Sequence, residues 1–166
     1  GGVGKTMVAK VIFNKYQHMF DGRSFLPNVR KVKELVDSQN KLLSDILRSG
    51  NMKVSTVDEG TNDIKRRLGN KRVLVVVDDV DSDAQLDALA IKHDSFGPGS
   101  RIIITTRDQQ LLKILNVEAI CTVQEMNKDE ALELLSWHAF KKNYPNEEYV
   151  ELSRKAVDYC GGLPLA

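Results

Sequence analysis

The first six residues have types and spacing that could bind phosphate. Gly-Gly-Val-Gly-Lys-Thr fills the last six positions of the pattern G-x-x-x-x-G-K-[ST]. Glycines in such a loop let backbone N–H groups surround phosphate oxygens at the positive end of the following helix. Lys5 would reach the β- and γ-phosphates, and the Thr6 hydroxyl would bind Mg²⁺. The candidate nucleotide-binding residues here are Gly1, Gly2, Val3, Gly4, Lys5, Thr6 and Met7. The alternative is a plain glycine turn before a helix, with Lys5 exposed.

Two adjacent acids, Asp78 and Asp79, follow the apolar run 73–77. Carboxylates at the end of a buried strand are costly unless a positive charge lies opposite them. A Mg²⁺ ion held between Thr6 and Asp78 would supply that charge. Asp79 would then orient a water toward the terminal phosphate as a weak general base, which would be its catalytic role. The alternative is that both carboxylates cap the next helix.

Arg107 follows a second apolar run, residues 101–105. Ligands of doubly wound parallel sheets bind at the carboxyl ends of the strands. We therefore expect Arg107 on the same edge as Lys5 and Asp78, where it could contact the terminal phosphate. The alternative is a surface arginine paired with Asp108.

The base is predicted to be adenine, because the elements that recognise guanine are not matched. Asn127-Lys128-Asp129-Glu130 comes nearest to N-K-x-D, but its spacing is that of a helix cap. Asp94-Ser95-Phe96-Gly97 matches D-x-x-G without following a strand.

Strands and helices alternate along the chain and would position these groups. Continuous β-branched runs predict buried strands over 73–77 and 101–105, with an edge strand near 24–29 and a weaker strand over 119–123. Helical periodicity is found over 4–18, 40–47, 57–68, 84–90, 109–115, 130–140 and 147–160. This alternation predicts an α/β fold with a mostly parallel sheet.

Composition excludes several classes of function. Lys plus Arg number 24 and Asp plus Glu 23, so the net charge of +1 offers no global attraction for nucleic acid or an anionic membrane. The basic residues 65–67 are interpreted as a solvated helix face. No apolar run is long enough to span a membrane. Cys121 and Cys160 are predicted to be small core residues of a cytoplasmic protein, and the histidines lack the spacing of a zinc site.

Four blocks occur in a fixed order: GGVGKT, VLVVVDDVD, GSRIIITTRD and GGLPLA. In that order the chain resembles the NB-ARC region of plant disease-resistance proteins with leucine-rich repeats, which belong to the switch-ATPase superfamily. FDGRSFLPNVRKVKE and Asp81 are similar to the subclass with an N-terminal TIR domain. The resemblance implies that Pro164 packs near the adenine, with Leu163 as an apolar neighbour. The alternative for Pro164 is the first turn of a helix. Met7 departs from the Thr more frequent in the family, at a position that is not the metal ligand.

The resemblance implies a P-loop NTPase fold, with a nucleotide-binding lobe over 1–125 and the start of a helical ARC lobe over 126–166. The strand that precedes the loop in such folds is missing from the sequence. Its expected neighbours, 73–77 and 101–105, should then lose backbone hydrogen bonds.

The implied function is an ADP/ATP switch in plant immunity, reset by slow hydrolysis. TIR and leucine-rich-repeat domains would flank it, and the active state could be an oligomer. Two alternatives stay open: a P-loop ATPase with true turnover, and an inert interaction module with a vestigial site.

Overall fold

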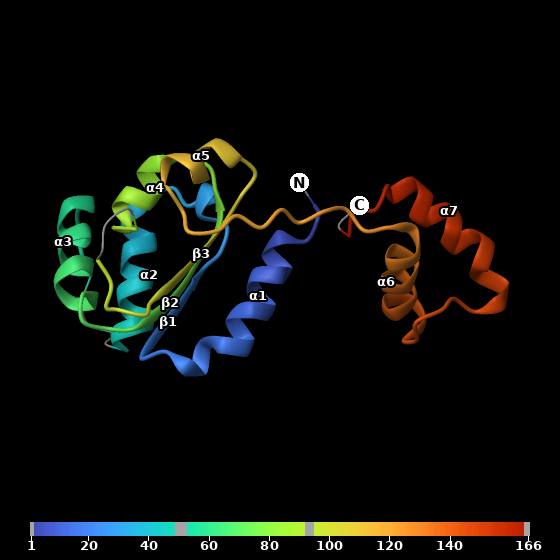
Figure 1. The fold of residues 1–166 in the computed structure, drawn as a ribbon, viewed down its shortest axis with the longest axis horizontal. Coiled ribbons are helices and arrows are strands. Elements are labelled where there is room, and N and C mark those ends of the chain that lie inside the picture. Colours follow the sequence, from blue (N-terminus) through green and yellow to red (C-terminus); the bar gives the residue numbers. More distant parts are fainter. Residues whose placement is uncertain (1, 49–52, 92–94, 165–166) are drawn as a thin grey trace. The chain divides into compact units, whose positions relative to one another are not determined.

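A computed structural model describes residues 2–48, 53–91 and 95–164. The chain divides into two compact units (Figure 1). One comprises Thr6–Ile120, and the other comprises Gly1–Lys5 with Cys121–Ala166. The first unit contains the sheet and most of the helices, and the second contains the loop glycines and the last two α-helices.

A parallel sheet forms the centre of the first unit. Its strands are β1 (Gly22–Leu26), β2 (Val73–Val80) and β3 (Arg101–Thr106), in the spatial order β1-β2-β3. The central strand β2 is buried along its length apart from Asp79, which is partly buried. Its β-branched residues suit this place because a parallel strand covered on both faces needs apolar side chains on both. The predicted α/β fold with a parallel sheet is confirmed.

The pairing of β2 with β3 differs from the expectation. Leu74 lies opposite Arg101 and Val77 opposite Ile104, so the two strands are hydrogen-bonded directly to each other. The prediction that both strands would lose backbone hydrogen bonds is therefore wrong for β2, which is paired with β1 on one side and with β3 on the other; among the described strands, β3 pairs with β2 alone. The physical reason is that buried backbone groups require partners, and each of these two strands supplies them to the other.

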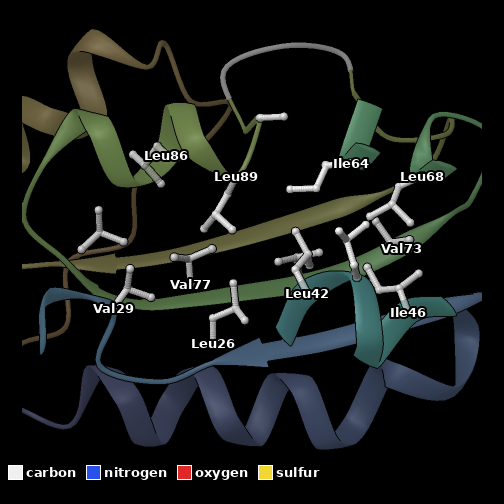
Figure 2. Packing of buried hydrophobic residues seen from close by; sticks show 14 of the residues in the cluster. Leu26, Val29, Leu42, Ile46, Ile64, Leu68, Val73, Val77, Leu86 and Leu89 are labelled. Carbon is white, nitrogen blue, oxygen red and sulfur yellow. The ribbon is translucent and has the colours of Figure 1, made fainter. Parts of the chain in front are cut away.

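Helices cover both faces of the sheet. On one face, α2 (Leu35–Leu47), α3 (Val57–Leu68) and α4 (Asp83–Ala88) enclose the main core, to which α5 (Gln109–Ile114) adds Leu111. Figure 2 shows side chains of this core between the sheet and the helices. They include Leu26, Leu42, Ile64, Val77, Leu86 and Leu89. The helix α1 (Lys5–Tyr16) runs along the opposite face, where Phe13 meets Phe25 of β1 edge-on at 5.6 Å.

One buried glutamine joins the three helices of the main core. The amide nitrogen of Gln39 in α2 donates to the carbonyl oxygens of Val57 and Ala88, at 2.8 and 2.7 Å. Its Oε1 atom has no hydrogen-bond partner among the described residues. A Cβ atom added to Gly60 of α3 would overlap the Gln39 amide. Gly60 therefore makes room for Gln39.

The second unit has a helical hairpin, formed by α6 (Lys128–Phe140) and α7 (Val150–Cys160), with a 3₁₀ turn over Glu147–Tyr149. Asn127 and Glu130 form the predicted capping box of α6. Lys128 Nζ donates to Asp158 Oδ1 at 2.6 Å, and this hydrogen bond raises the pKa of Lys128. Trp137, in α6, is half exposed.

Some local predictions are wrong. Residues 119–123, all within the described part of the chain, form no strand, and Cys121 is exposed rather than in the core. None of the strands in the described part of the chain pairs with this run, and an unpaired strand gains no ladder of hydrogen bonds. Cys160 is only partly buried. The first helix ends at Tyr16 and continues as a 3₁₀ turn over Gln17–Met19. Among the described residues, none of the helices is both long and apolar enough to cross a membrane.

Candidate nucleotide-binding site

The start of α1 and the end of β2 meet through one hydrogen bond. Thr6, the second residue of α1, donates from Oγ1 to Oδ1 of Asp78 at 2.7 Å. Asp78 is fully buried at the carboxyl end of the central strand. The two residues predicted to share a metal ion are thus within hydrogen-bond distance, although 72 positions separate them in the sequence.

Two further elements contribute hydrogen bonds to the Asp78 carboxylate. The hydroxyl of Thr105, at the end of β3, donates to Asp78 Oδ1 at 2.7 Å and accepts the backbone N–H of Asp79 at 2.9 Å. The backbone N–H of Asn28, just after β1, donates to Asp78 Oδ2 at 3.5 Å. The carboxyl ends of all three strands therefore converge on Asp78, which is where ligands of open parallel sheets bind.

Asp79 lies in a special backbone conformation between two arginines. Its φ is 58°, a left-handed value unusual for a residue with a side chain, and it interrupts the regular pairing of β2 with β3. Its Oδ2 pairs with Arg30 Nη2 at 3.1 Å, and its Oδ1 pairs with Arg107 Nε at 3.3 Å. Such conformations are costly for a residue with a side chain and are enriched at functional sites.

The sequence alone is compatible with a pair between Arg107 and Asp108, and with helix-capping roles for Asp78 and Asp79. Asp108 does not pair with Arg107 in the described part of the chain, and instead caps α5 by accepting the Gln110 N–H at 2.8 Å. Asp78 and Asp79 are not caps of the next helix either, because Ser82 forms the capping box of α4 with Gln85. Neither carboxylate therefore serves as a cap of the next helix.

The loop residues lie in the second unit. Gly2 and Gly4 have φ values of 90° and 96°, which only glycine adopts without strain, and α1 begins at Lys5. Gly1 lies outside the described residues. A Cβ atom built on Gly4 would lie 3.9 Å from Cγ of Pro164, so the proline of the GLPLA block neighbours the loop.

The remaining predicted site residues differ in their surroundings. Val3 and Lys5 are partly buried, and Met7 is exposed on α1. Leu163 lines, together with Pro164, an apolar pocket of about 190 Å³ between α6 and α7. This pocket lies wholly within the second unit.

Sequence reasoning missed Arg30, Asn28 and the role of Thr105. Asn28 and Arg30 follow the carboxyl end of β1, and Thr105 lies near the carboxyl end of β3. Polar residues at strand ends in a parallel sheet were the available signal. This signal is clear after the apolar runs 73–77 and 101–105, and it is weaker after the first strand because Pro27 interrupts the strand pattern there.

The donor set at Thr6 and Asp78 fits magnesium. Mg²⁺ takes oxygen ligands and is usually held by one or two protein groups, with phosphate oxygens and waters completing its octahedron. Here a hydroxyl and a carboxylate oxygen are adjacent. The described residues hold no cluster of three or more His, Cys, Asp or Glu side chains that could bind a metal unaided. The residues present therefore suit a metal that arrives with a phosphate ligand.

Two features define the P-loop class of nucleotide-binding folds. One is a glycine loop directly before a helix, and the other is an acidic residue at a strand end that is hydrogen-bonded to the Thr of that helix. The sequence profile of the NB-ARC domain matches residues 1–145. The chain belongs to the NB-ARC family and is a nucleotide-binding module.

Curated relatives are plant disease-resistance proteins. Disease resistance protein RUN1 of Vitis rotundifolia is 42% identical over 170 residues, which cover 100% of this chain and 13% of that protein. TMV resistance protein N of Nicotiana glutinosa is 41% identical over 174 residues, which cover 100% of this chain and 15% of that protein. Disease resistance protein RPP2B of Arabidopsis thaliana is 36% identical, over 99% of this chain and 14% of that protein. The predicted resemblance to TIR-type resistance proteins is confirmed, and the chain spans only a small part of the length of these relatives.

Proposed function

We propose that this chain is the ADP/ATP-binding switch of a plant intracellular immune receptor. The observation that carries the proposal is the 2.7 Å hydrogen bond between Thr6 Oγ1 and Asp78 Oδ1. It joins the end of the phosphate loop to the acidic end of the central strand. These two groups would bind Mg²⁺ together with the phosphates of the nucleotide, and that ion would neutralise the buried Asp78 carboxylate.

Each remaining site residue has a role in this proposal. The loop from Gly1 to Gly4 surrounds the phosphates with backbone N–H groups, and Lys5 binds the β- and γ-phosphates. Pro164 and Leu163 cover the adenine, which the proximity of Pro164 to Gly4 supports. Arg107 contacts the terminal phosphate, and Asp79 orients the attacking water.

The switch would operate between two lobes, residues 1–125 and residues 126–166. ADP would favour the state in which the helical lobe is held, and exchange for ATP would favour its release. The surrounding protein would be cytoplasmic and would include TIR and leucine-rich-repeat domains, with an oligomer as the active state. Hydrolysis would be slow and would return the switch to its resting state.

The test is nucleotide binding by a longer chain that includes residues 1–166 and the sequence on both sides. Isothermal calorimetry would measure the affinity for ADP with and without Mg²⁺, for the wild type and for Thr6→Val. The matched control is Thr122→Val, because Thr122 is exposed and lies outside the site. We expect Mg²⁺ to strengthen ADP binding by the wild type and by the control, but not by Thr6→Val. Equal responses to Mg²⁺ in all three proteins would reject the metal site.

A further inference from the structure

Two arginines share the carboxylate of Asp79. Arg30 Nη2 lies 3.1 Å from Oδ2, and Arg107 Nε lies 3.3 Å from Oδ1, so each oxygen already has a cationic partner. The Asp79 side chain is only 15% exposed. One negative charge is thus divided between two positive charges, and the group as a whole is a cation.

The two arginines are held differently. Arg30 belongs to the 3₁₀ turn over Val29–Lys31, which begins after Asn28, and the Asn28 N–H donates to Asp78. Its side chain is 35% exposed. The side chain of Arg107 is 55% exposed, and its Nε lies 3.3 Å from Asp79 Oδ1, slightly farther than Arg30 Nη2 lies from Oδ2. Arg107 is therefore the partner that can leave Asp79 more readily.

We propose that Arg30 sets the preference of the site for ATP over ADP by sharing the Asp79 carboxylate with Arg107 and thereby weakening the ion pair between Asp79 and Arg107. The proposal rests on the function proposed above, in which Arg107 contacts the terminal phosphate. The Asp79 carboxylate and the terminal phosphate are two anions that can each pair with the guanidinium of Arg107. Arg30 weakens the hold of Asp79 on Arg107 because it satisfies part of the same negative charge. It is a specificity-determining residue that acts through Asp79 rather than through the nucleotide.

The direction of the effect follows from linkage. ADP has no terminal phosphate to offer Arg107, so ADP binding does not depend on whether Arg107 leaves Asp79. ATP binding requires Arg107 to leave Asp79 and pair with the terminal phosphate. A tighter pair between Asp79 and Arg107 therefore weakens the binding of ATP but not the binding of ADP. Loss of the charge at residue 30 should therefore lower the ratio of the ADP dissociation constant to the ATP dissociation constant.

The experiment measures this ratio in the longer chain, with a non-hydrolysable ATP analogue in place of ATP. Arg30→Gln should lower the ratio about three- to fivefold, the range expected for one partly exposed ion pair, with ADP affinity unchanged. Arg30→Lys keeps the charge and should stay within about twofold of the wild type. Arg101→Gln is the matched control, since Arg101 is exposed at the amino end of β3 and should leave the ratio unchanged.

The same substitution made in the Asp79→Asn variant distinguishes the proposal from a direct contact between Arg30 and the phosphate. In Asp79→Asn the rival anion is gone, so the ratio should rise, and adding Arg30→Gln should then have no further effect. A fall in the ratio on adding Arg30→Gln to Asp79→Asn would mean that Arg30 touches the phosphate itself, and would overturn the proposal. Equal weakening of ADP and ATP by Arg30→Gln would show a structural role and would also overturn it.

The proposed function can fail independently. A wild type that binds neither nucleotide would reject that function, and this inference with it. A wild type that binds both, with an unchanged ratio in Arg30→Gln, would reject this inference alone.

Discussion

The hydroxyl of Thr105 donates to the buried carboxylate of Asp78 at 2.7 Å and thereby holds the end of β3 against the end of β2. The same oxygen accepts the N–H of Asp79, the residue whose backbone is left-handed. One threonine therefore fixes both acids at the carboxyl edge of the sheet, the first through its side chain and the second through its backbone.

Thr105→Val is expected to reduce stability. Valine keeps the shape of threonine but removes the hydroxyl, leaving the buried Asp78 with one hydrogen bond fewer and the Asp79 N–H without its acceptor. An unsatisfied buried polar group costs about 1–3 kcal/mol. Urea denaturation would measure the loss in the free energy of unfolding. Thr122→Val is the control, and equal stability of the two variants would contradict the role given to Thr105.

Lys5→Ala is expected to weaken nucleotide binding by about 10- to 150-fold. This range corresponds to the loss of charge-assisted phosphate contacts worth about 1.5–3 kcal/mol. Calorimetric titration with ADP provides the measurement. Lys10→Ala removes another lysine of α1, one that is exposed, and should bind ADP like the wild type. Unchanged affinity in Lys5→Ala would reject the phosphate-loop assignment.

Gly60→Ala tests the junction of the three helices. In an ordinary helix position the change would stabilise by about 0.5–1 kcal/mol. Here the new methyl group would overlap the Gln39 amide, so we expect a loss of about 1–3 kcal/mol instead. Asn62→Ala, at an exposed position of the same helix, is the control. The sign of the change in thermal stability decides between the two outcomes.

Hydrolysis by the wild type is expected to be slow. Asp79 is held by two arginines, and its side chain is short, so its carboxylate is poorly placed to approach an attacking water. A misplacement of about 1 Å can lower a rate about 100-fold. Phosphate release under steady-state conditions would measure the turnover, and Asp79→Glu should alter it without abolishing binding. A wild-type turnover above about 10 per second would favour an ordinary ATPase over a switch.

The sheet was predictable where the sequence signal was local and strong. The β-branched runs after Arg72 and Ser100 became β2 and β3, and Asn127 with Glu130 formed the expected cap. The weaker apolar run 119–123 pairs with none of the described strands, and composition alone does not reveal whether a strand will find a partner.

The site was predictable in part for a related reason. Thr6 and Asp78 belong to motifs whose chemistry requires each other, so their contact could be anticipated across 72 positions. The pairing of Arg107 could not be read from spacing, because Asp108 is its chain neighbour while Asp79 reaches it only through the register of β2 and β3. The pairing of Arg30 with Asp79 could not be read from spacing either, because the fold and not the sequence brings the two residues together.

The single tryptophan of the chain, Trp137, lies in α6. Fluorescence excited selectively at the indole therefore reports on the helical hairpin and carries no direct signal from the sheet. Circular dichroism in the far ultraviolet reports on both units, so the two measurements follow different parts of the same molecule. Coincident melting curves from fluorescence and circular dichroism would identify a single cooperative transition, and separated curves would show that the hairpin melts by itself.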